Sequence, residues 1–168
     1  MIHLFRLLWL GLFIALGAQI MSVYPQLPEQ IAVHFNVQGQ ADAFGGKQEF
    51  YIFFSILIAF LNIIFLCISV IIKKIPNSIL SVPWKSYWFA NEERSNIAYR
   101  KLSEILAMAA VLFNGLFYLI NLIILRSSTS PEPCPTGDFI HGNFIWIALS
   151  CTTIHLVLSF LIIKPPKS

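Results

Sequence analysis

Four polar residues outside the apolar runs of this chain have side chains that could bind a metal ion or move a proton. They are His34, Asp42, Asp138 and His141. Imidazole and carboxylate groups are ligands of zinc, and a His–Asp pair can act as a general base. However, their spacing matches no short metal motif, and the sequence contains neither GxSxG nor HExxH. We therefore predict no bound metal and no cofactor, and we favour a binding or structural role over catalysis.

Two of these residues, His34 and Asp42, belong to a polar, turn-rich segment at residues 24–49, between two long apolar runs. The segment holds two prolines, three glycines and three acidic residues, which a plain connector between membrane helices does not need. We therefore expect function in this loop. The loop residues that we expect to recognise a ligand are His34, Asn36, Gly39, Asp42 and Lys47.

The middle of this loop has the pattern of a short strand that turns back on itself. Apolar and polar residues alternate over residues 30–37, with Ile31 and Val33 on one face and His34 on the other. We expect the apolar face to lie on the membrane helices, so that the segment forms a hairpin or compact loop over them. The turn should use the positive φ that glycine permits, at Gly39 and at the pair Gly45 and Gly46.

The composition indicates that lipid, and not water, surrounds most of the chain. Hydrophobic residues make up 57% and charged residues only 11%, and the mean hydropathy is +0.75. Soluble domains carry about 25% charged residues. The net charge of +3 is spread over several segments and forms no dense basic patch. We therefore expect the lipid bilayer as a partner, and no nucleic acid.

Four apolar runs are long enough to cross a bilayer, which takes about 20 helical residues. They cover residues 4–23, 50–72, 105–125 and 144–163. The predicted fold class is an all-α integral membrane protein with four transmembrane helices and a small extracytoplasmic loop or hairpin between the first two. We divide the chain into a two-helix unit with the 24–49 loop, a cytoplasmic, Trp-rich amphipathic connector, and a second helix pair with outer loop 126–143. These three parts span residues 4–72, 73–104 and 105–163.

Positive charges set the expected orientation, since cytoplasmic loops are rich in lysine and arginine. The other two loops carry only Lys47 and Arg126, whereas the connector carries Lys73, Lys74, Lys85, Arg94, Arg100 and Lys101. We therefore place both termini and the connector in the cytoplasm and the 24–49 loop outside. Residues 1–18 also have the pattern of a signal peptide, but the apolar run continues to Val23, which favours an uncleaved helix.

The connector is expected to form an interfacial arm whose aromatic rings lie at headgroup level, with a cytoplasmic protein as an alternative partner. Its members are Trp84, Tyr87, Trp88 and Arg94. Asn91 can cap a helix that starts just after it, with Glu92 and Glu93 in the first turn, where the helix dipole favours anions. This helix should run unbroken into the third span and project beyond the membrane.

Polar residues inside the predicted spans should point into the helix bundle, because lipid cannot satisfy their hydrogen bonds. Asn62, Asn114 and His155 lie near the middle of their spans and are expected to form one intramembrane polar layer. The favoured interpretation is that these residues hold helices together through hydrogen bonds. A proton, ion or ligand site around His155 is the alternative.

Two further stripes are expected to face other helices of the bundle. One consists of small residues in the first span, Gly11, Ala15 and Ala18. The other consists of polar residues at intervals of seven in the second span, Ser55, Asn62 and Ser69.

The segment LPEQIAVHFNVQGQADAFGGK resembles the outer loop of a bacterial membrane family catalogued as domain of unknown function 1648. The family pattern runs roughly LP-x-x-I-x-x-HF(N/D)-x-x-G-x-x-D-x-(W/Y/F)-G. The matching residues are Leu27, Pro28, Ile31, His34, Phe35, Asn36, Gly39, Asp42, Phe44 and Gly45. The resemblance covers about residues 5–70, and Ala32 stands where family members often carry proline. A second likeness, in VPWKSYWFANEER, extends it toward the rest of the chain.

The best-known relatives that this resemblance implies are SdpI-type proteins. These proteins protect bacteria against a secreted peptide toxin and bind a repressor. The resemblance therefore implies a non-enzymatic protein of the bacterial cytoplasmic membrane that senses, binds or protects against something outside, such as a peptide or a small molecule. Two other classes stay open. One is a small transporter or channel subunit that uses the polar layer, and the other is a membrane-embedded, metal-dependent enzyme that uses the outer His and Asp residues. The oligomeric state is not fixed by these residues.

Overall fold

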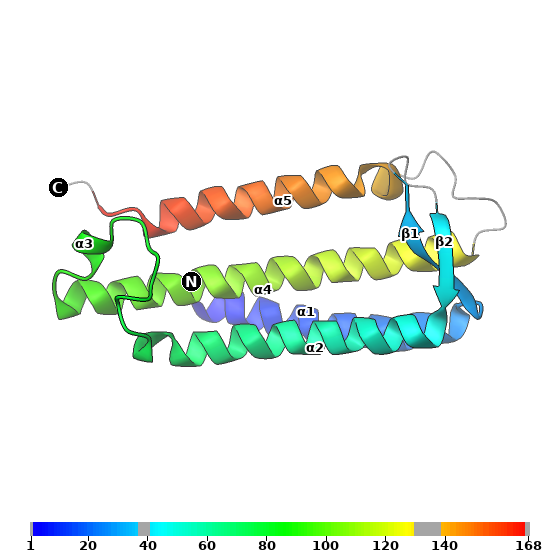
Figure 1. Ribbon diagram of the computed structural model, residues 1–168, viewed down its shortest axis with the longest axis horizontal. Coiled ribbons are helices and arrows are strands. Elements are labelled where there is room, and N and C mark those ends of the chain that lie inside the picture. Colours follow the sequence, from blue (N-terminus) through cyan, green and yellow to red (C-terminus); the bar gives the residue numbers. More distant parts are fainter. Residues whose placement is uncertain (1, 37–40, 130–138, 167–168) are drawn as a thin grey trace.

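The computed structural model describes residues 2–36, 41–129 and 139–166 of the chain. Four long helices run nearly parallel or antiparallel to one another and give the molecule its elongated shape (Figure 1). They are α1 (Ile2–Val23), α2 (Lys47–Ile71), α4 (Glu92–Thr129) and α5 (Phe139–Ile163). Short helices lie between them: η1 (Tyr24–Gln26), η2 (Ile72–Lys74) and α3 (Lys85–Trp88).

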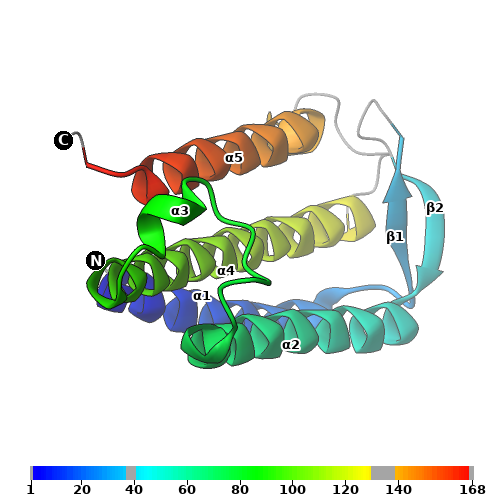
Figure 2. The same cartoon turned by 60° about the vertical axis from the view of Figure 1, so that its left-hand side comes forward.

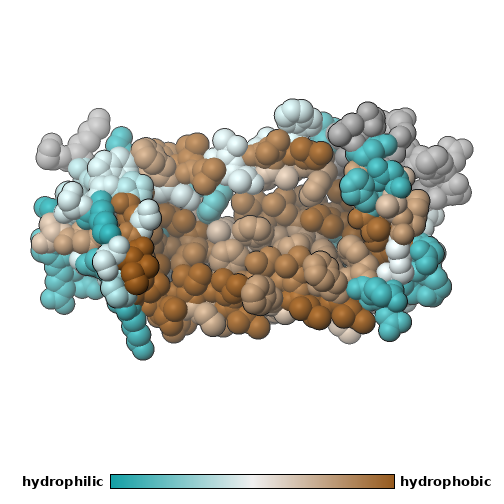
Figure 3. All heavy atoms as spheres, viewed as in Figure 1, coloured by the Kyte–Doolittle hydropathy of each residue, from teal (hydrophilic) through white to brown (hydrophobic). Residues whose placement is uncertain are grey.

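The four long helices are all long and apolar enough to cross a membrane. Figure 3 shows hydrophobic residues covering the middle of the molecule and hydrophilic residues gathered at its two ends. This distribution suits a bilayer, whose hydrocarbon core touches only the middle of a spanning helix. The predicted all-α membrane fold with four spanning helices is therefore confirmed, and the chain is a multi-pass membrane protein.

The two polar ends differ in structure. One end, here called the hairpin end, carries a small β-hairpin between α1 and α2 (Figure 1). The other, here called the arm end, carries α3, the connector loop and both chain termini (Figures 1 and 2). The division of the chain at residues 73 and 105 stays a prediction.

Helix α4 is the central element of the bundle, since it contacts α1, α2 and α5. Helix α5 lies on one side of α4, and α1 and α2 lie on the other (Figure 2). Small and polar residues that are buried on α4 allow this close packing, among them Ala98, Ala107, Ala110, Asn114 and Asn121.

The length of α4 confirms the helix predicted from Asn91 into the third span. The backbone N–H of Arg94 donates to Asn91 Oδ1 at 2.9 Å, which is the bond expected of an N-terminal cap. The helix then continues for 38 residues, or about 57 Å at 1.5 Å per residue. This exceeds the hydrocarbon thickness of about 30 Å, so α4 extends beyond the apolar layer.

The stripe of small residues in α1 was expected to face other helices, but it lies on an exposed side of α1. Gly11, Ala15 and Ala18 are exposed, and a Cβ added at Gly11 would meet no atom within 4 Å. The reason is that α1 contacts α4 through a different stripe, which includes the buried Leu16 and Gln19. Burial of these larger side chains decides the rotation of α1 in this chain.

The predicted hairpin is present between the C-terminal end of α1 and the N-terminal end of α2. Strands β1 (Gln30–Phe35) and β2 (Ala41–Gly46) pair antiparallel, with Ala32 opposite Phe44 and His34 opposite Ala43. Val33 therefore has no residue opposite it, and the register shifts there as in a β-bulge.

This bulge overturns the predicted alternation of the strand. Ile31 and Ala32 are both fully buried, whereas Val33 is 39% exposed. An extra residue in one strand rotates the side chains that follow it, so that Val33 turns away from the bundle. His34 remains exposed, as the alternation predicted.

The glycines at 45 and 46 also act differently from the prediction, because neither has a positive φ. A Cβ at Gly45 would lie only 3.2 Å from Val33 Cγ1, so this glycine makes room for the bulged valine. Gly46 precedes α2 with φ −62°, and a Cβ there would collide with the carboxylate of Glu49. Gly45 thus leaves room for Val33, the Glu49 carboxylate at Gly46 is the end of a flexible side chain that can move, and neither glycine supplies left-handed backbone.

The arm end is held together by two side chains that bond to the backbone at the end of α5. The buried Trp88 donates through Nε1 to the backbone oxygen of Ile163 at 2.8 Å. Lys101 of α4 donates to the oxygen of Ile162 and lies 4.9 Å from the Trp88 ring. Both bonds satisfy carbonyl groups that the last turn of a helix leaves without partners.

Replacing Trp88 by phenylalanine should lower the free energy of unfolding by about 1–2 kcal/mol, because the Ile163 carbonyl would lose its buried donor. The matched control is Trp84→Phe, whose partly exposed ring packs on Phe160 at 5.0 Å and which should change stability by at most about 0.5 kcal/mol. Equilibrium unfolding in mixed micelles measures both values. Equal losses of stability in the two variants would show that the bond from Trp88 to Ile163 does not stabilise the protein.

Candidate functional site

The hairpin end brings two of the predicted recognition residues together. His34 of β1 and Asp42 of β2 lie across the hairpin, with Nδ1 and Oδ1 2.5 Å apart. Their side chains are 69% and 42% exposed, so the pair faces away from the helices. Because Nδ1 is engaged by the carboxylate, the ring is oriented and its Nε2 atom can bond to an outside group.

Lys47, a third predicted recognition residue, instead makes contacts within the chain. Its Nζ atom donates to the Leu27 oxygen at 3.0 Å, pairs with Glu29 at 3.1 Å, and lies 5.3 Å from the centre of the Tyr24 ring. The side chain is only 15% exposed. These contacts join the first turn of α2 to the chain that enters β1, and they hold the base of the hairpin.

The remaining outer candidates are placed only in part. Asn36 is partly buried just after β1. Gly39 and Asp138 lie outside the described residues, and so does the side chain of His141. Within the described residues, no three His, Cys, Asp or Glu side chains gather as a metal site would require. The alternative of a metal site at His34, Asp42, Asp138 and His141 stays untested, because the last two side chains lie outside the described residues.

The hairpin rests on a core shared by α1, α2 and α4. Ile31 of β1 packs into it, and the backbone N–H of Ala32 donates to Ser128 Oγ at 3.1 Å near the end of α4. The buried residues of this cluster are Leu16, Val23, Leu27, Ile31, Tyr51, Phe54, Ile58 and Ile124. The hairpin is thus docked on three helices, and its position depends on their packing.

A chain of hydrogen bonds lies just below this docking point. The Tyr51 hydroxyl donates to Asn121 Oδ1 at 2.5 Å, and Asn121 Nδ2 donates to Gln19 Oε1 at 3.2 Å. All three residues are buried, and they come from α2, α4 and α1. Gln19 Nε2 has no bonding partner among the described residues. Sequence reasoning missed Tyr51, because a tyrosine near the end of a span is typical of the membrane interface.

A second polar cluster lies deeper in the bundle. The amides of Asn62 and Asn114 exchange two hydrogen bonds of 3.0 Å, and Trp9 Nε1 donates to Asn62 Oδ1 at 2.5 Å. His155 instead lies 3.5 Å from Ser159 of its own helix. Amides that satisfy one another support a packing role, and a transport role of these residues stays a prediction. The role of Trp9 was not predicted from the sequence, because a single tryptophan in an apolar run forms no periodic polar pattern.

Comparison with known proteins shows that part of the chain matches a protein family. Residues 10–59 match the family model described as domain of unknown function (DUF1648). The resemblance inferred from the HFN motif is therefore confirmed over this segment. The DUF1648 segment begins within α1, contains the whole hairpin, and ends halfway along α2. No curated protein and no solved structure matches the chain, so the likeness to SdpI-type proteins stays a prediction.

The arm residues, which follow the DUF1648 segment in sequence, form a packed cluster. Trp88 is only 2% exposed, so its ring is packed inside the protein, and the depth of the arm residues at headgroup level stays a prediction. Trp88 is buried because its N–H bonds to the end of α5. Arg94 Cζ lies 4.3 Å from the centre of the Tyr87 ring. Trp84 adopts the left-handed backbone with φ 53°, which costs about 1–2 kcal/mol, and its contact with Phe160 offsets part of that cost.

Proposed function

We propose that this protein is a non-enzymatic binding protein of the bacterial cytoplasmic membrane, and that its hairpin binds a peptide outside the cell membrane. The distribution of positive charge supports the orientation, since Lys73, Lys74 and Lys101 belong to the arm end. Cytoplasmic ends of membrane proteins are enriched in such residues. The hairpin end would then face the exterior.

The observation that carries the proposal is the exposed strand β2. The described sheet has two strands, so β2 has one edge without a strand partner in the described chain. Residues 42–44 of this strand are exposed. An extended peptide can add to such an edge through main-chain hydrogen bonds, and its side chains then meet those of the receptor strand.

Two features of β2 would give the added peptide its specificity. Phe44 is 60% exposed at the outer surface, where a large aromatic ring can serve as an anchor for a ligand. Next to it, the His34–Asp42 pair presents an oriented imidazole and a carboxylate. A peptide with an apolar side chain and a neighbouring polar or basic group fits this surface best.

The base of the hairpin supports a binding role because it is fixed before any ligand arrives. Ile31 is fully buried between the helices, and Lys47 closes the base of the hairpin. A docked strand loses little conformational freedom on binding, which increases the affinity that a given contact area yields.

The test measures peptide retention by the purified protein in lipid nanodiscs. The peptide fraction of culture medium from the source cells is passed over the nanodiscs, and retained peptides are quantified by mass spectrometry. We expect a peptide that the native chain retains and that Phe44→Ala retains about 30-fold less, because burial of a phenylalanine is worth about 2 kcal/mol.

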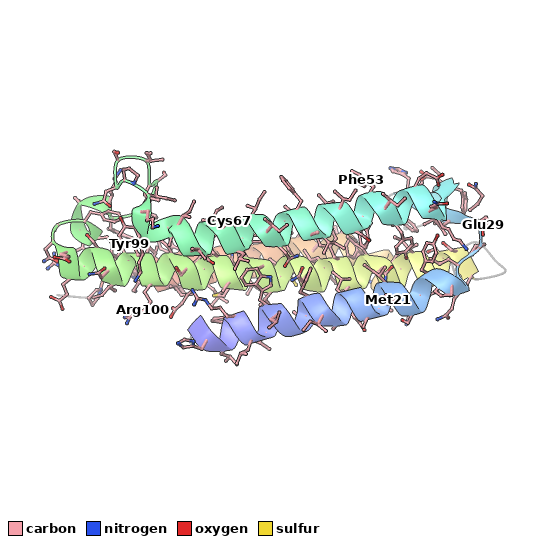
Figure 4. The ribbon with its side chains drawn as sticks, turned by 90° about the horizontal axis from the view of Figure 1, so that it is seen from below. Met21, Glu29, Phe53, Cys67, Tyr99 and Arg100 are labelled. Carbon is pink, nitrogen blue, oxygen red and sulfur yellow. The ribbon has the colours of Figure 1, made fainter. Side chains whose placement is uncertain are left out.

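The matched control is Phe53→Ala, which removes a 65% exposed ring from α2 outside the hairpin. Phe53 points away from the bundle in Figure 4, and its removal should leave retention unchanged. Retention no greater than on empty nanodiscs, or an equal loss in both variants, would overturn the proposal.

A further inference from the structure

A groove runs along the bundle between α1 and α2, here called the α1–α2 groove. Both helices contact α4, which lies between them in Figure 4. The arm-side part of the groove has a volume of about 520 Å³, and a second part of about 370 Å³ continues it toward the hairpin end. Phe13 and Ala59 line both parts, so the groove is continuous.

The walls of the arm-side part are mostly apolar. Leu10 and Phe13 of α1 face Ile63 and Leu66 of α2 across it. Asn62 also lines it, but its amide is already bonded to Asn114 and Trp9. The groove therefore offers a surface that suits a hydrocarbon chain.

A positive charge lies at the arm end of this groove. Arg6 lines the groove opposite Ser69 and Val70, which belong to the last turns of α2. Among the described residues, Arg6 has no carboxylate within ion-pair distance. The exposed Lys73 and Lys74 follow directly after α2 and add to the positive charge at this end.

The depth of the arm-side part matches one leaflet of a bilayer. On α2 it extends from Ala59 to Val70, which is about 16 Å at 1.5 Å per residue. Half of a hydrocarbon core of about 30 Å is about 15 Å. A lipid whose headgroup lies beside Arg6 would thus place its chain along the apolar walls.

We propose that the arm-side part of the α1–α2 groove binds one anionic phospholipid. Arg6 holds the phosphate, Lys73 and Lys74 add to the attraction, and one acyl chain lies between α1 and α2. Basic pockets between transmembrane helices are known sites for anionic headgroups. A helix of a second copy suits the groove less well, because it would cover Arg6 with apolar surface and leave the guanidinium without a counter-charge.

The experiment measures which lipid the intact protein retains. Protein reconstituted in equal amounts of phosphatidylglycerol and phosphatidylcholine is extracted into mild detergent and examined by native mass spectrometry. We expect one phosphatidylglycerol per chain, in preference to phosphatidylcholine. Arg6→Gln should lower this retention about fivefold, as expected for one cation near a membrane surface. Lys164→Gln is the matched control, because it removes an exposed cation at the end of α5 and should change nothing.

A second variant tests the groove without changing a charge. Ala59→Phe would fill the groove from α2 and should abolish the retained lipid, whereas Ala18→Phe on an exposed face of α1 should not. Circular dichroism shows whether each variant keeps its helical content. Equal retention of both lipids, unchanged retention in Ala59→Phe, or a lipid-free dimer whose cross-links lie in the groove would each overturn the proposal.

Discussion

Replacement of Asn121 by leucine is expected to lower the free energy of unfolding by about 2–4 kcal/mol, since two buried polar groups would lose their partner at once. These groups are the Tyr51 hydroxyl and the side-chain oxygen of Gln19. Asn121 is fully buried, so no water would replace the lost bonds. Equilibrium unfolding in mixed micelles, followed by helical circular dichroism, measures the change.

A double-mutant cycle separates the bond from the loss of packing. Tyr51→Phe alone removes the donor and should cost about 1 kcal/mol. The double variant Tyr51→Phe/Asn121→Leu should then be more stable than Asn121→Leu alone, because no hydroxyl is left buried and unpaired. Strictly additive costs would contradict the bond between Tyr51 and Asn121.

The position of this network explains why its effect should reach the hairpin. Tyr51 belongs to the same buried cluster as Ile31, and its ring also packs edge-on against Tyr24 at 5.5 Å. The three helices that the network joins are the three on which the hairpin rests. A bundle loosened at Asn121 should therefore hold β1 less firmly, even though Asn121 is not part of the hairpin.

The membrane architecture could be predicted from the sequence because it depends on local properties. Hydropathy alone identifies the spans, since lipid excludes charged residues from a segment of about 20 residues. The start of α4 was equally predictable, because the cap at Asn91 requires only a side chain and a backbone N–H three residues later. The HFN motif likewise identified the segment that matches DUF1648.

What the sequence did not show depends on contacts between distant residues. Trp88 is buried because it meets the end of α5, which lies 75 residues further along the chain. Trp9 joins the Asn62–Asn114 amide pair across 53 residues. The small residues of α1 are exposed, although their pattern predicted contact with other helices. Periodicity shows that a stripe exists but does not show which neighbour it meets.

The bulge at Val33 is the deviation with the most direct consequence for the candidate site. A regular strand would place Ile31 and Val33 on the same face, and the alternation in the sequence predicted this. The observed register leaves Val33 unpaired and turns it outward. The exposed surface beside His34 is therefore more apolar than the sequence pattern indicated.

Truncation of Ile31 to alanine should consequently lower the free energy of unfolding by about 2–5 kcal/mol, as expected when a fully buried isoleucine leaves a cavity. Ile31 is 0% exposed and packs within the cluster that joins the hairpin to α1, α2 and α4. Hydrogen exchange should also become faster in β1 and β2, because the hairpin would lose its main docking contact. Unfolding in micelles and exchange of the strand amides measure the two effects.

Val33→Ala is the matched control, since it shortens an aliphatic side chain only two residues away in the same strand. With its side chain 39% exposed, we expect a change of at most about 0.5 kcal/mol and unchanged exchange. A regular strand would instead make both truncations costly, because both side chains would lie against the helices. Similar losses for the two variants would therefore contradict the bulge and the outward position of Val33.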